Sequence, residues 1–274
     1  MANEIIKQFL DSRNEELLSV QEMKNGTDSK VFLVNEKYIF KFHNPNTIKA
    51  EFEYFNSYPC DINEKIVFVS KDYSYIVYEF IENDGTLENI ESLILKIKDY
   101  VDVYPVFDGD KFGFLFEETN TWLECLKNEL EDKKVHSLKV LNESDYQKAL
   151  HALEMLGNYT FTKKLMHGDF GLHNLLFLNH RLIGIIDPQP LIGDPLYDFI
   201  FCILSDEDIA NPEIIMNLHA FAPNEPKEKI DAMIVFVLFC RIARCVKYHL
   251  AELDHFKKLW QTLAIDNSQN HPII

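Results

Sequence analysis

The sequence lacks an apolar run long enough to cross a membrane. Its longest strong run, residues 232–240, is far shorter than the roughly 20 residues that a spanning helix needs. We therefore expect this run in a buried helix, and no membrane as partner. The N-terminal residues lack the basic flank and apolar core of a secretory signal. The 5 cysteines form no C-x-x-C pair. These absences predict a cytoplasmic protein.

Positive charge is also scarce. The 274 residues include 27 Lys and Arg against 44 Asp and Glu, which gives a formal net charge of −17. Nucleic acids and anionic membranes bind basic surfaces, so the charge balance argues against both as partners. An acidic surface attracts small cationic molecules instead and raises their local concentration.

Several catalytic motifs are missing. There is no H-E-x-x-H, G-x-S-x-G or Cys/His cluster, which argues against a metallohydrolase or a serine hydrolase. There is also no G-x-G-x-x-G and no G-x-x-x-x-G-K-[ST]. A phosphate-binding loop in this chain must therefore be built in another way.

The most informative segment that is present starts at His167 and reads H-G-D-F-G-L-H-N. Phosphoryl transfer needs a carboxylate that accepts a proton from the attacking hydroxyl, and oxygen ligands for magnesium. Asp169 can be the base, whereas Asn174 and Asp187 can be the metal ligands. The alternative is that these residues only form turns, which Asp, Asn and Gly favour.

This pattern resembles the aminoglycoside phosphotransferase and choline-kinase-like superfamily. The family pattern is H-G-D-x-x-x-x-N, then an apolar residue and Asp, then G-D-P-x-x-D, and residues 165–198 contain all of it. The resemblance implies an α+β, two-lobed, protein-kinase-like fold, with a small antiparallel β-sheet lobe carrying one helix and a larger, mainly helical lobe. It also implies Asp169 as catalytic base, Asn174 and Asp187 as magnesium ligands, and ATP or GTP with Mg²⁺ as cofactors.

Departures from protein kinases indicate a small substrate. Gly168 stands where protein kinases have the arginine that couples the site to an activation loop, and Pro188 follows the metal-ligand aspartate. Proline fixes φ and removes a backbone donor, so Asp187 should be a static ligand. In the Gly-Asp-Pro segment, Asp194 and Asp198 are expected to cap a helix more than to take part in catalysis.

The N-terminal part should hold the nucleotide. Residues 18–34 predict a hairpin whose turn, with the hydroxyls of Thr27 and Ser29, can cover phosphates. Residues 37–43 predict an alternating strand, and by resemblance its Lys41 binds the α and β phosphates and pairs with a glutamate of the next helix. Glu51 is the predicted partner and Glu53 its rival, because the register of this helix is not fixed by the sequence.

The apolar run 75–81 predicts a buried strand that leads into an interlobe linker. By resemblance, backbone groups from Glu79 to Ile81 bind the purine, although an ordinary strand end would have the same residues. The expected boundaries are a nucleotide-binding lobe at 1–80, a linker at 81–85 and a catalytic and substrate-binding lobe at 86–274. In the third segment, Asn120 or Thr121 is expected to cap a helix that begins at Trp122.

These expectations predict a magnesium-dependent O-phosphotransferase whose acceptor is a small cationic molecule, an aminoglycoside antibiotic in first place. Two alternatives stay open. One is a metabolic kinase that acts on choline, a fructosamine, a thioribose or an amino alcohol. The other is a pseudokinase that binds nucleotide without catalysis, which the retained base, metal ligands and lysine disfavour. We expect a monomer or a weak dimer.

Overall fold

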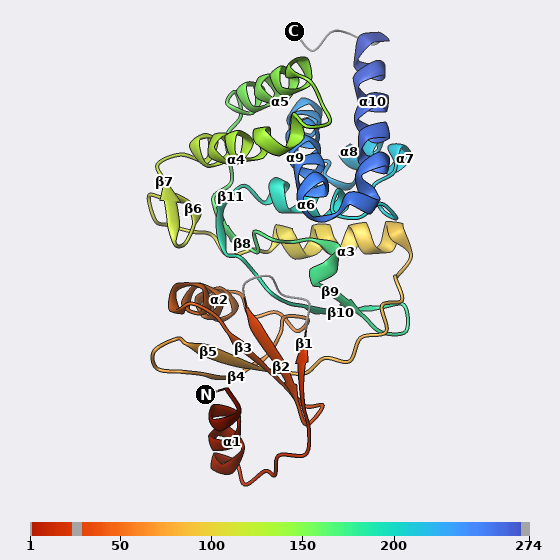
Figure 1. Ribbon diagram of the computed structural model, residues 1–274. Helices are drawn as coiled ribbons and strands as arrows, with labels where there is room; N and C mark the ends of the chain where they lie inside the picture. The colour runs from red at the N-terminus through yellow and green to blue at the C-terminus, as the bar shows by residue number, and fades with distance from the viewer. Residues whose placement is uncertain (1, 24–28, 270–274) are drawn as a thin grey trace. The chain divides into compact units, whose positions relative to one another are not determined.

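The computed structural model describes residues 2–23 and 29–269, and the chain divides into two compact units (Figure 1). Unit 1 comprises Met1–Glu88 and Asn174–Pro190, and unit 2 comprises Asn89–His173 and Leu191–Ile274. The segment that contains the predicted catalytic residues is therefore divided between the two units. Asp169 belongs to unit 2, whereas Asn174 and Asp187 belong to unit 1.

Unit 1 is built on one antiparallel sheet in the order β1-β2-β3-β5-β4. Its strands are β1 (Val20–Met23), β2 (Lys30–Val34), β3 (Tyr38–Phe42), β4 (Ile66–Val69) and β5 (Tyr75–Glu79). The predicted hairpin is confirmed as β1 and β2. Strand β3 lies at the centre, where Lys41 is opposite Val31 on one side and Ile76 on the other.

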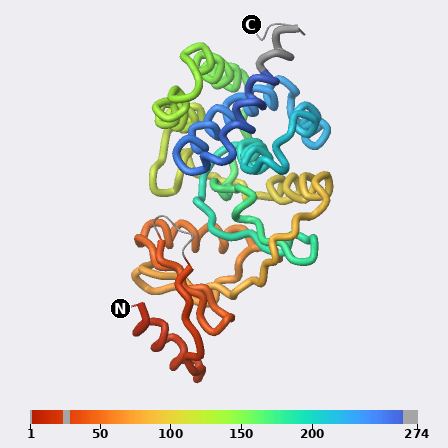
Figure 2. Tube along the Cα trace, turned by 45° about the vertical axis from the view of Figure 1, so that its right-hand side comes forward, coloured from red at the N-terminus to blue at the C-terminus, as the bar shows by residue number. Residues whose placement is uncertain are grey.

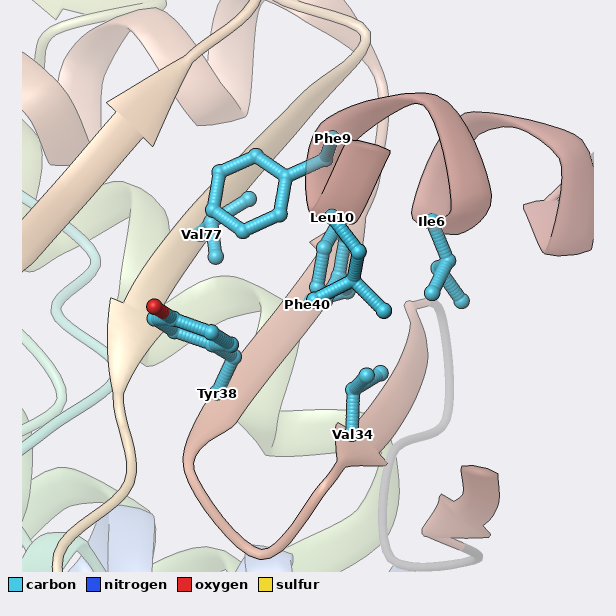
Figure 3. Packing of buried hydrophobic residues seen from close by; sticks show 7 residues of the cluster. All are labelled: Ile6, Phe9, Leu10, Val34, Tyr38, Phe40 and Val77. Carbon is cyan, nitrogen blue, oxygen red and sulfur yellow. The ribbon is translucent and has the colours of Figure 1, made fainter. Parts of the chain in front are cut away.

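Two helices cover the two faces of this sheet. Helix α1 (Ala2–Ser12), which the sequence analysis did not anticipate, packs its apolar side on the face that carries Phe40 (Figure 3). The cluster there consists of Ile6, Phe9, Leu10, Val34, Tyr38, Phe40 and Val77. Neighbouring side chains of a strand point to opposite faces, so Lys41 points away from α1.

Helix α2 (Pro45–Ser57) covers the face to which Lys41 points. Asn44 caps its N-terminus, since the side-chain Oδ1 accepts the Thr47 N–H at 3.0 Å, and Pro45 occupies the first turn, where a missing N–H costs nothing. This start fixes the helical register, and with it the side chain that reaches β3.

A second, small hairpin completes unit 1. It consists of β9 (Leu175–Phe177) and β10 (Leu182–Ile185). The Phe177 N–H donates to Asn83 Oδ1 at 3.0 Å, and the Ile185 N–H donates to Ile62 O at 2.7 Å, so the hairpin is tied to the N-terminal part of the unit. Asn174 directly precedes β9, and Asp187 follows β10 by two residues.

Unit 2 is mainly helical and is organised around one long helix, α9 (Lys227–Tyr248), which packs against α4, α5, α6 and α10 (Figures 1 and 2). Its other helices are α3 (Ile90–Asp102), α4 (Trp122–Ser137), α5 (Glu143–Leu156), α6 (Pro195–Ile203), α7 (Pro212–Met216), α8 (Leu218–Phe221) and α10 (Leu253–Gln269). Short 3₁₀ turns lie at Leu172–Asn174 and Leu250–Glu252, and Asn174, the last residue of the first turn, belongs to unit 1. Unit 2 also contains a small antiparallel sheet with the strand order β7-β6-β11-β8. Its strands are β6 (Phe112–Phe114), β7 (Glu117–Thr119), β8 (Lys164–Met166) and β11 (Leu191–Gly193).

Two local predictions in unit 2 are confirmed. Thr121, and not Asn120, caps α4, because its Oγ1 accepts the Glu124 N–H at 3.0 Å. The apolar run 232–240 lies inside α9, and all but one of its side chains are buried. Within the described residues, no helix is both long and apolar enough to span a bilayer.

Candidate active site

A buried ion pair lies at the centre of unit 1. Lys41 Nζ contacts both carboxylate oxygens of Glu51, at 2.9 Å to Oε1 and 2.8 Å to Oε2. The hydroxyl of Tyr78 on β5 donates to Glu51 Oε1 at 2.7 Å. The Glu51 side chain is fully shielded from solvent, and that of Lys41 is 9% exposed. A buried carboxylate with these three contacts holds the lysine in one place.

The structure also decides between the two glutamates of α2. Glu53 lies on the exposed side of the helix, where it pairs with Lys49 at 3.7 Å. Burial by itself disfavours a charged lysine, but the carboxylates of Glu51 and Asp187 outweigh it and raise the pKa of Lys41. Lys41 is therefore a permanent cation, as a phosphate-binding lysine must be.

The two predicted metal ligands are brought together in unit 1. The Ile186 N–H donates to the backbone oxygen of Asn174 at 3.0 Å, which joins the start of β9 to the residue before Asp187. Asp187 adopts a left-handed backbone with φ of 58°, and its exposed carboxylate contacts Lys41 through Oδ1. Asn174 itself is buried. The hairpin thus brings the backbone of Asn174 next to the residue that precedes Asp187.

This donor set fits magnesium. Mg²⁺ prefers oxygen ligands and is usually held by one or two protein groups together with substrate phosphates and water. Asn174 and Asp187 supply such oxygens. Among the residues that the structure describes, no group of three or more His, Cys, Asp and Glu side chains is arranged to hold a metal. Asn174 and Asp187 are the residues that would hold such an ion.

The structure places the other residues that were predicted to contact the nucleotide in different settings. Thr27 lies outside the described residues, and Ser29 stands just before β2 with a partly buried side chain. The Glu79 N–H is already used, because it donates to Lys65 O at 3.0 Å. Ile81 packs close to Gly184, where a Cβ would lie only 3.0 Å from Ile81 Cδ1. Ile81 lies next to the β9–β10 hairpin, against Gly184.

Asp169 lies in unit 2 on a tightly turned loop. Gly168 adopts φ of 80°, a conformation suited to glycine, and the Gly171 N–H donates to Asp169 O at 2.8 Å. His173, in the 3₁₀ turn that follows, brings its Nε2 to 3.6 Å from Asp169 Oδ2. Burial alone would raise the pKa of Asp169, but the interaction with His173 and nearby positive charges hold it below its usual value. The carboxylate is ionised and able to accept a proton.

The two aspartates of the Gly-Asp-Pro segment have different roles. Asp194 caps α6 as predicted, since Oδ1 accepts the Leu196 N–H at 3.0 Å. The prediction was wrong for Asp198, whose Oδ2 accepts the Gly168 N–H at 3.1 Å and the Tyr104 hydroxyl at 2.9 Å. Asp198 therefore anchors the backbone next to Asp169. Sequence spacing did not reveal this, because the contacts join segments 30 or more residues apart.

We expect Asp198→Asn to change how stability depends on pH. Burial, only partly offset by the hydrogen bonds from Gly168, Tyr104 and His167, raises the pKa of Asp198 to about 7. The folded protein then holds a proton that the unfolded chain has already released above roughly pH 4. Relative to the variant, the wild-type protein should lose about 1.4 kcal/mol of stability per pH unit between roughly pH 4 and 7, and no more above that.

Urea unfolding of both proteins at a series of pH values measures this difference. Asparagine keeps the shape of the side chain but cannot titrate, so the comparison isolates one proton. A difference that stays constant from pH 4 to 7 would show that Asp198 is ionised in the folded state.

The sequence comparisons agree with this geometry. The model of the phosphotransferase enzyme family matches residues 105–229, the segment that contains Asp169, Asn174 and Asp187. Over this segment the chain is similar to the phosphotransferase enzyme family. The resemblance inferred from the motifs is thereby confirmed, and the chain is a kinase-type phosphotransferase with a hydroxyl acceptor. A search of curated proteins finds no match.

Solved structures confirm the fold class of this phosphotransferase. A ternary complex of a thermostable aminoglycoside phosphotransferase APH(4)-Ia variant with AMP-PNP and hygromycin B superimposes with a TM-score of 0.65 at 15% identity, covering 97% of this chain and 99% of the other. The GDP and kanamycin complex of APH(2″)-IIIa gives 0.62 at 16% identity, over 99% and 100% of the two chains. ADP-bound APH(2″)-Ib gives 0.60 at 18% identity, over 96% and 98%. The α+β, protein-kinase-like fold is shared along the whole chain.

Proposed function

We propose that this phosphotransferase moves the γ-phosphoryl group of ATP or GTP, with Mg²⁺, to a hydroxyl of a small cationic molecule, an aminoglycoside in first place. The observation that carries the proposal is the cluster in unit 1, where Lys41, held by Glu51, lies against Asp187 while Asn174 is joined to the same hairpin end. A lysine that contacts phosphates and two oxygen ligands for magnesium are the groups with which enzymes of this kind bind a nucleoside triphosphate.

The residues of unit 1 act on the nucleotide. Lys41 binds the α and β phosphates, and Glu51 and Tyr78 keep its ammonium group fixed. Asn174 and Asp187 hold magnesium, which neutralises phosphate charge when it is bound. The backbone of Ile81 binds the purine, with its apolar side chain against the base. Ser29 and Thr27 donate their hydroxyls to phosphate oxygens.

Asp169 acts on the acceptor. Its ionised carboxylate accepts a hydrogen bond from the attacking hydroxyl. This bond orients a lone pair of the hydroxyl oxygen towards the γ-phosphorus. As the new O–P bond forms and the bond to the β-phosphate oxygen breaks, the hydroxyl proton passes to Asp169. The hydrogen bonds that Asp198 accepts keep the backbone of this loop in place, so the carboxylate needs no rearrangement before the reaction.

A cationic acceptor is supported by charge and by the relatives. The net charge of −17 favours positively charged ligands. Among structures that share the fold, one holds kanamycin and another hygromycin B. Their identity to this chain is 16% and 15%, so a metabolic amine or sugar derivative is the second candidate class of acceptor.

The experiment that tests the proposal measures consumption of ATP and of GTP, with and without magnesium, by the purified protein. The acceptor panel contains aminoglycosides such as kanamycin and hygromycin B, and choline, fructosamines and thioribose compounds. Asp169→Asn is the inactive control. Asp99→Asn is the matched control, because Asp99 is an exposed residue of α3 in the same unit.

Stimulation by an aminoglycoside that is lost in Asp169→Asn and kept in Asp99→Asn would support the proposal in full. Stimulation only by a metabolite would move the chain to the metabolic class. Nucleotide binding without any turnover across the panel would favour a pseudokinase and contradict the assigned chemistry.

A further inference from the structure

The loop that carries Asp169 is bound to the α6 region on both sides of this residue. On the N-terminal side, Asp198 Oδ2 accepts the Gly168 N–H at 3.1 Å. On the C-terminal side, the Leu172 N–H donates to Ser205 Oγ at 2.8 Å, and Ser205 follows the end of α6 by two residues. All five residues belong to unit 2. Neither the motif nor the family pattern singles out Ser205.

The Leu172 N–H needs an acceptor from another segment of the chain. Leu172 begins the 3₁₀ turn Leu172–Asn174, and the first N–H groups of a helix have no acceptor within that helix. Leu172 is also buried, where an unpaired backbone N–H costs about as much free energy as a lost hydrogen bond. Ser205 Oγ supplies the acceptor that the turn itself cannot provide.

The Ser205 hydroxyl is held in one orientation. Ser205 is buried, and its Oγ donates to Cys202 O at 2.7 Å, the same oxygen that accepts the Ser205 N–H at 3.2 Å. A serine hydroxyl has one proton and two acceptor lone pairs. Because the proton is directed to Cys202 O, a lone pair is left for the Leu172 N–H. Ser205 is therefore a fixed acceptor and not a freely rotating surface hydroxyl.

The bond at Leu172 affects Asp169 through His173. His173 lies in the same 3₁₀ turn, and its Nε2 is 3.6 Å from Asp169 Oδ2. The imidazole reaches back over Gly171, where a Cβ would lie only 2.6 Å from His173 Nδ1. The same Cβ would lie 3.5 Å from Ser205 Cβ, so the Gly171 backbone packs between the imidazole and Ser205. A shift of the backbone at Leu172 would therefore move the imidazole relative to the Asp169 carboxylate.

We propose that Ser205 is a positioning residue for the catalytic base: by accepting the Leu172 N–H, it holds the C-terminal side of the loop and so keeps Asp169 and His173 in the arrangement that the reaction uses. The proposal rests on the proposed function, in which Asp169 accepts the proton of the acceptor hydroxyl. Ser205 acts through the backbone, and its role requires no contact with the nucleotide or the acceptor. A misplacement of about 1 Å in an active site can cost about 100-fold in rate.

Three variants separate this role from a general contribution to the fold. Ser205→Ala removes the acceptor of the Leu172 N–H, whereas Ser205→Thr keeps a hydroxyl oxygen. Ser137→Ala is the matched control, because Ser137 is another buried serine of unit 2 and its hydroxyl donates to Phe239 O at 3.2 Å, between α4 and α9. The turnover number and the KM for the nucleotide are measured on the full-length proteins, with the acceptor found in the panel.

Ser205→Ala should lower the turnover number about 10- to 100-fold and leave the KM for the nucleotide close to the wild-type value. Ser205→Thr should restore most of the turnover number. Ser137→Ala should be less stable than the wild type but equally active. A turnover number near the wild-type value in Ser205→Ala would overturn the proposal. So would a Ser205→Thr protein as slow as Ser205→Ala, or an equal loss of turnover in Ser205→Ala and Ser137→Ala.

A second readout needs neither nucleotide nor acceptor. Hydrogen exchange of the Leu172 amide, followed by NMR, should be slow in the wild type and in Ser205→Thr and clearly faster in Ser205→Ala. If the wild-type protein phosphorylated no acceptor of the panel, the proposed function would fail, but the exchange measurement would still decide whether Ser205 holds the loop. Equal exchange rates in the wild type and Ser205→Ala would refute the positioning role itself.

Discussion

Replacing Asp169 with asparagine should lower the turnover number by about 10²- to 10⁴-fold, the range expected for loss of a general base. The asparagine side chain has almost the same shape and can still accept a hydrogen bond, but its amide cannot take up the proton of the acceptor hydroxyl. Nucleotide binding should not change, because Lys41, Asn174 and Asp187 all belong to the other unit. The turnover number is measured with the acceptor found in the panel, and nucleotide affinity with mant-ATP.

Asp99→Asn provides the control for this prediction, as the same chemical change at an exposed position of unit 2. The pH profile gives a further check. Because the pKa of Asp169 lies below its usual value, the base stays ionised above pH 5, and protonation of Asp169 should not reduce the wild-type rate between pH 5 and 8. An Asp169→Asn protein with a turnover number near that of the wild type would exclude Asp169 as the base.

The residue positions that could be predicted from the sequence are those that follow from the pattern of neighbouring residues. Alternation in β3 was enough to place Lys41 on the face opposite Phe40. The helix that carries Glu51 was expected from Thr47, and it begins two residues earlier, at Pro45, behind the cap Asn44. The hairpin of β9 and β10 brings Asn174 and Asp187 together, although they are 13 residues apart. Local spacing of this kind is short enough to interpret from the residues alone.

The residues that the sequence left open, missed or assigned wrongly depend on contacts between distant segments. Glu51 and Glu53 are equivalent until the helix packs on the sheet, and only then does one become buried against Lys41. Tyr78 joins the site from β5. Asp198 was interpreted as a helix cap from its neighbours in sequence, whereas its partners are Gly168 and Tyr104. Tertiary packing overrides the local preference in each case.

Removing one partner of the Lys41–Glu51 ion pair should lower stability as well as nucleotide binding. Lys41→Met removes the ammonium group but keeps most of the side-chain volume. It leaves Glu51, fully shielded from solvent, with Tyr78 as its remaining donor. Breaking a buried pair by removing one partner costs about 3–5 kcal/mol, because the other charge stays buried without compensation. The single variant should therefore unfold at a much lower urea concentration than the wild type.

The double variant Lys41→Met with Glu51→Gln separates the two contributions. A neutral amide at position 51 costs far less to bury than a carboxylate, so most of the lost stability should return. Nucleotide binding should stay weak, because no ammonium group is left to contact the phosphates. Stability is measured by urea unfolding and binding by mant-ATP titration on the same preparations.

The exposed pair on α2 serves as the matched control. Lys49→Met with Glu53→Gln removes the same two groups at a separation of 3.7 Å, but their side chains are 55% and 49% exposed. Surface pairs of this kind are worth about 0–1 kcal/mol, so neither stability nor binding should change much. If Lys41→Met were as stable as this control, the Glu51 carboxyl would not depend on Lys41 for its charge compensation. If the double variant at 41 and 51 bound nucleotide like the wild type, Lys41 would not be the phosphate contact, because this variant has no ammonium group at position 41.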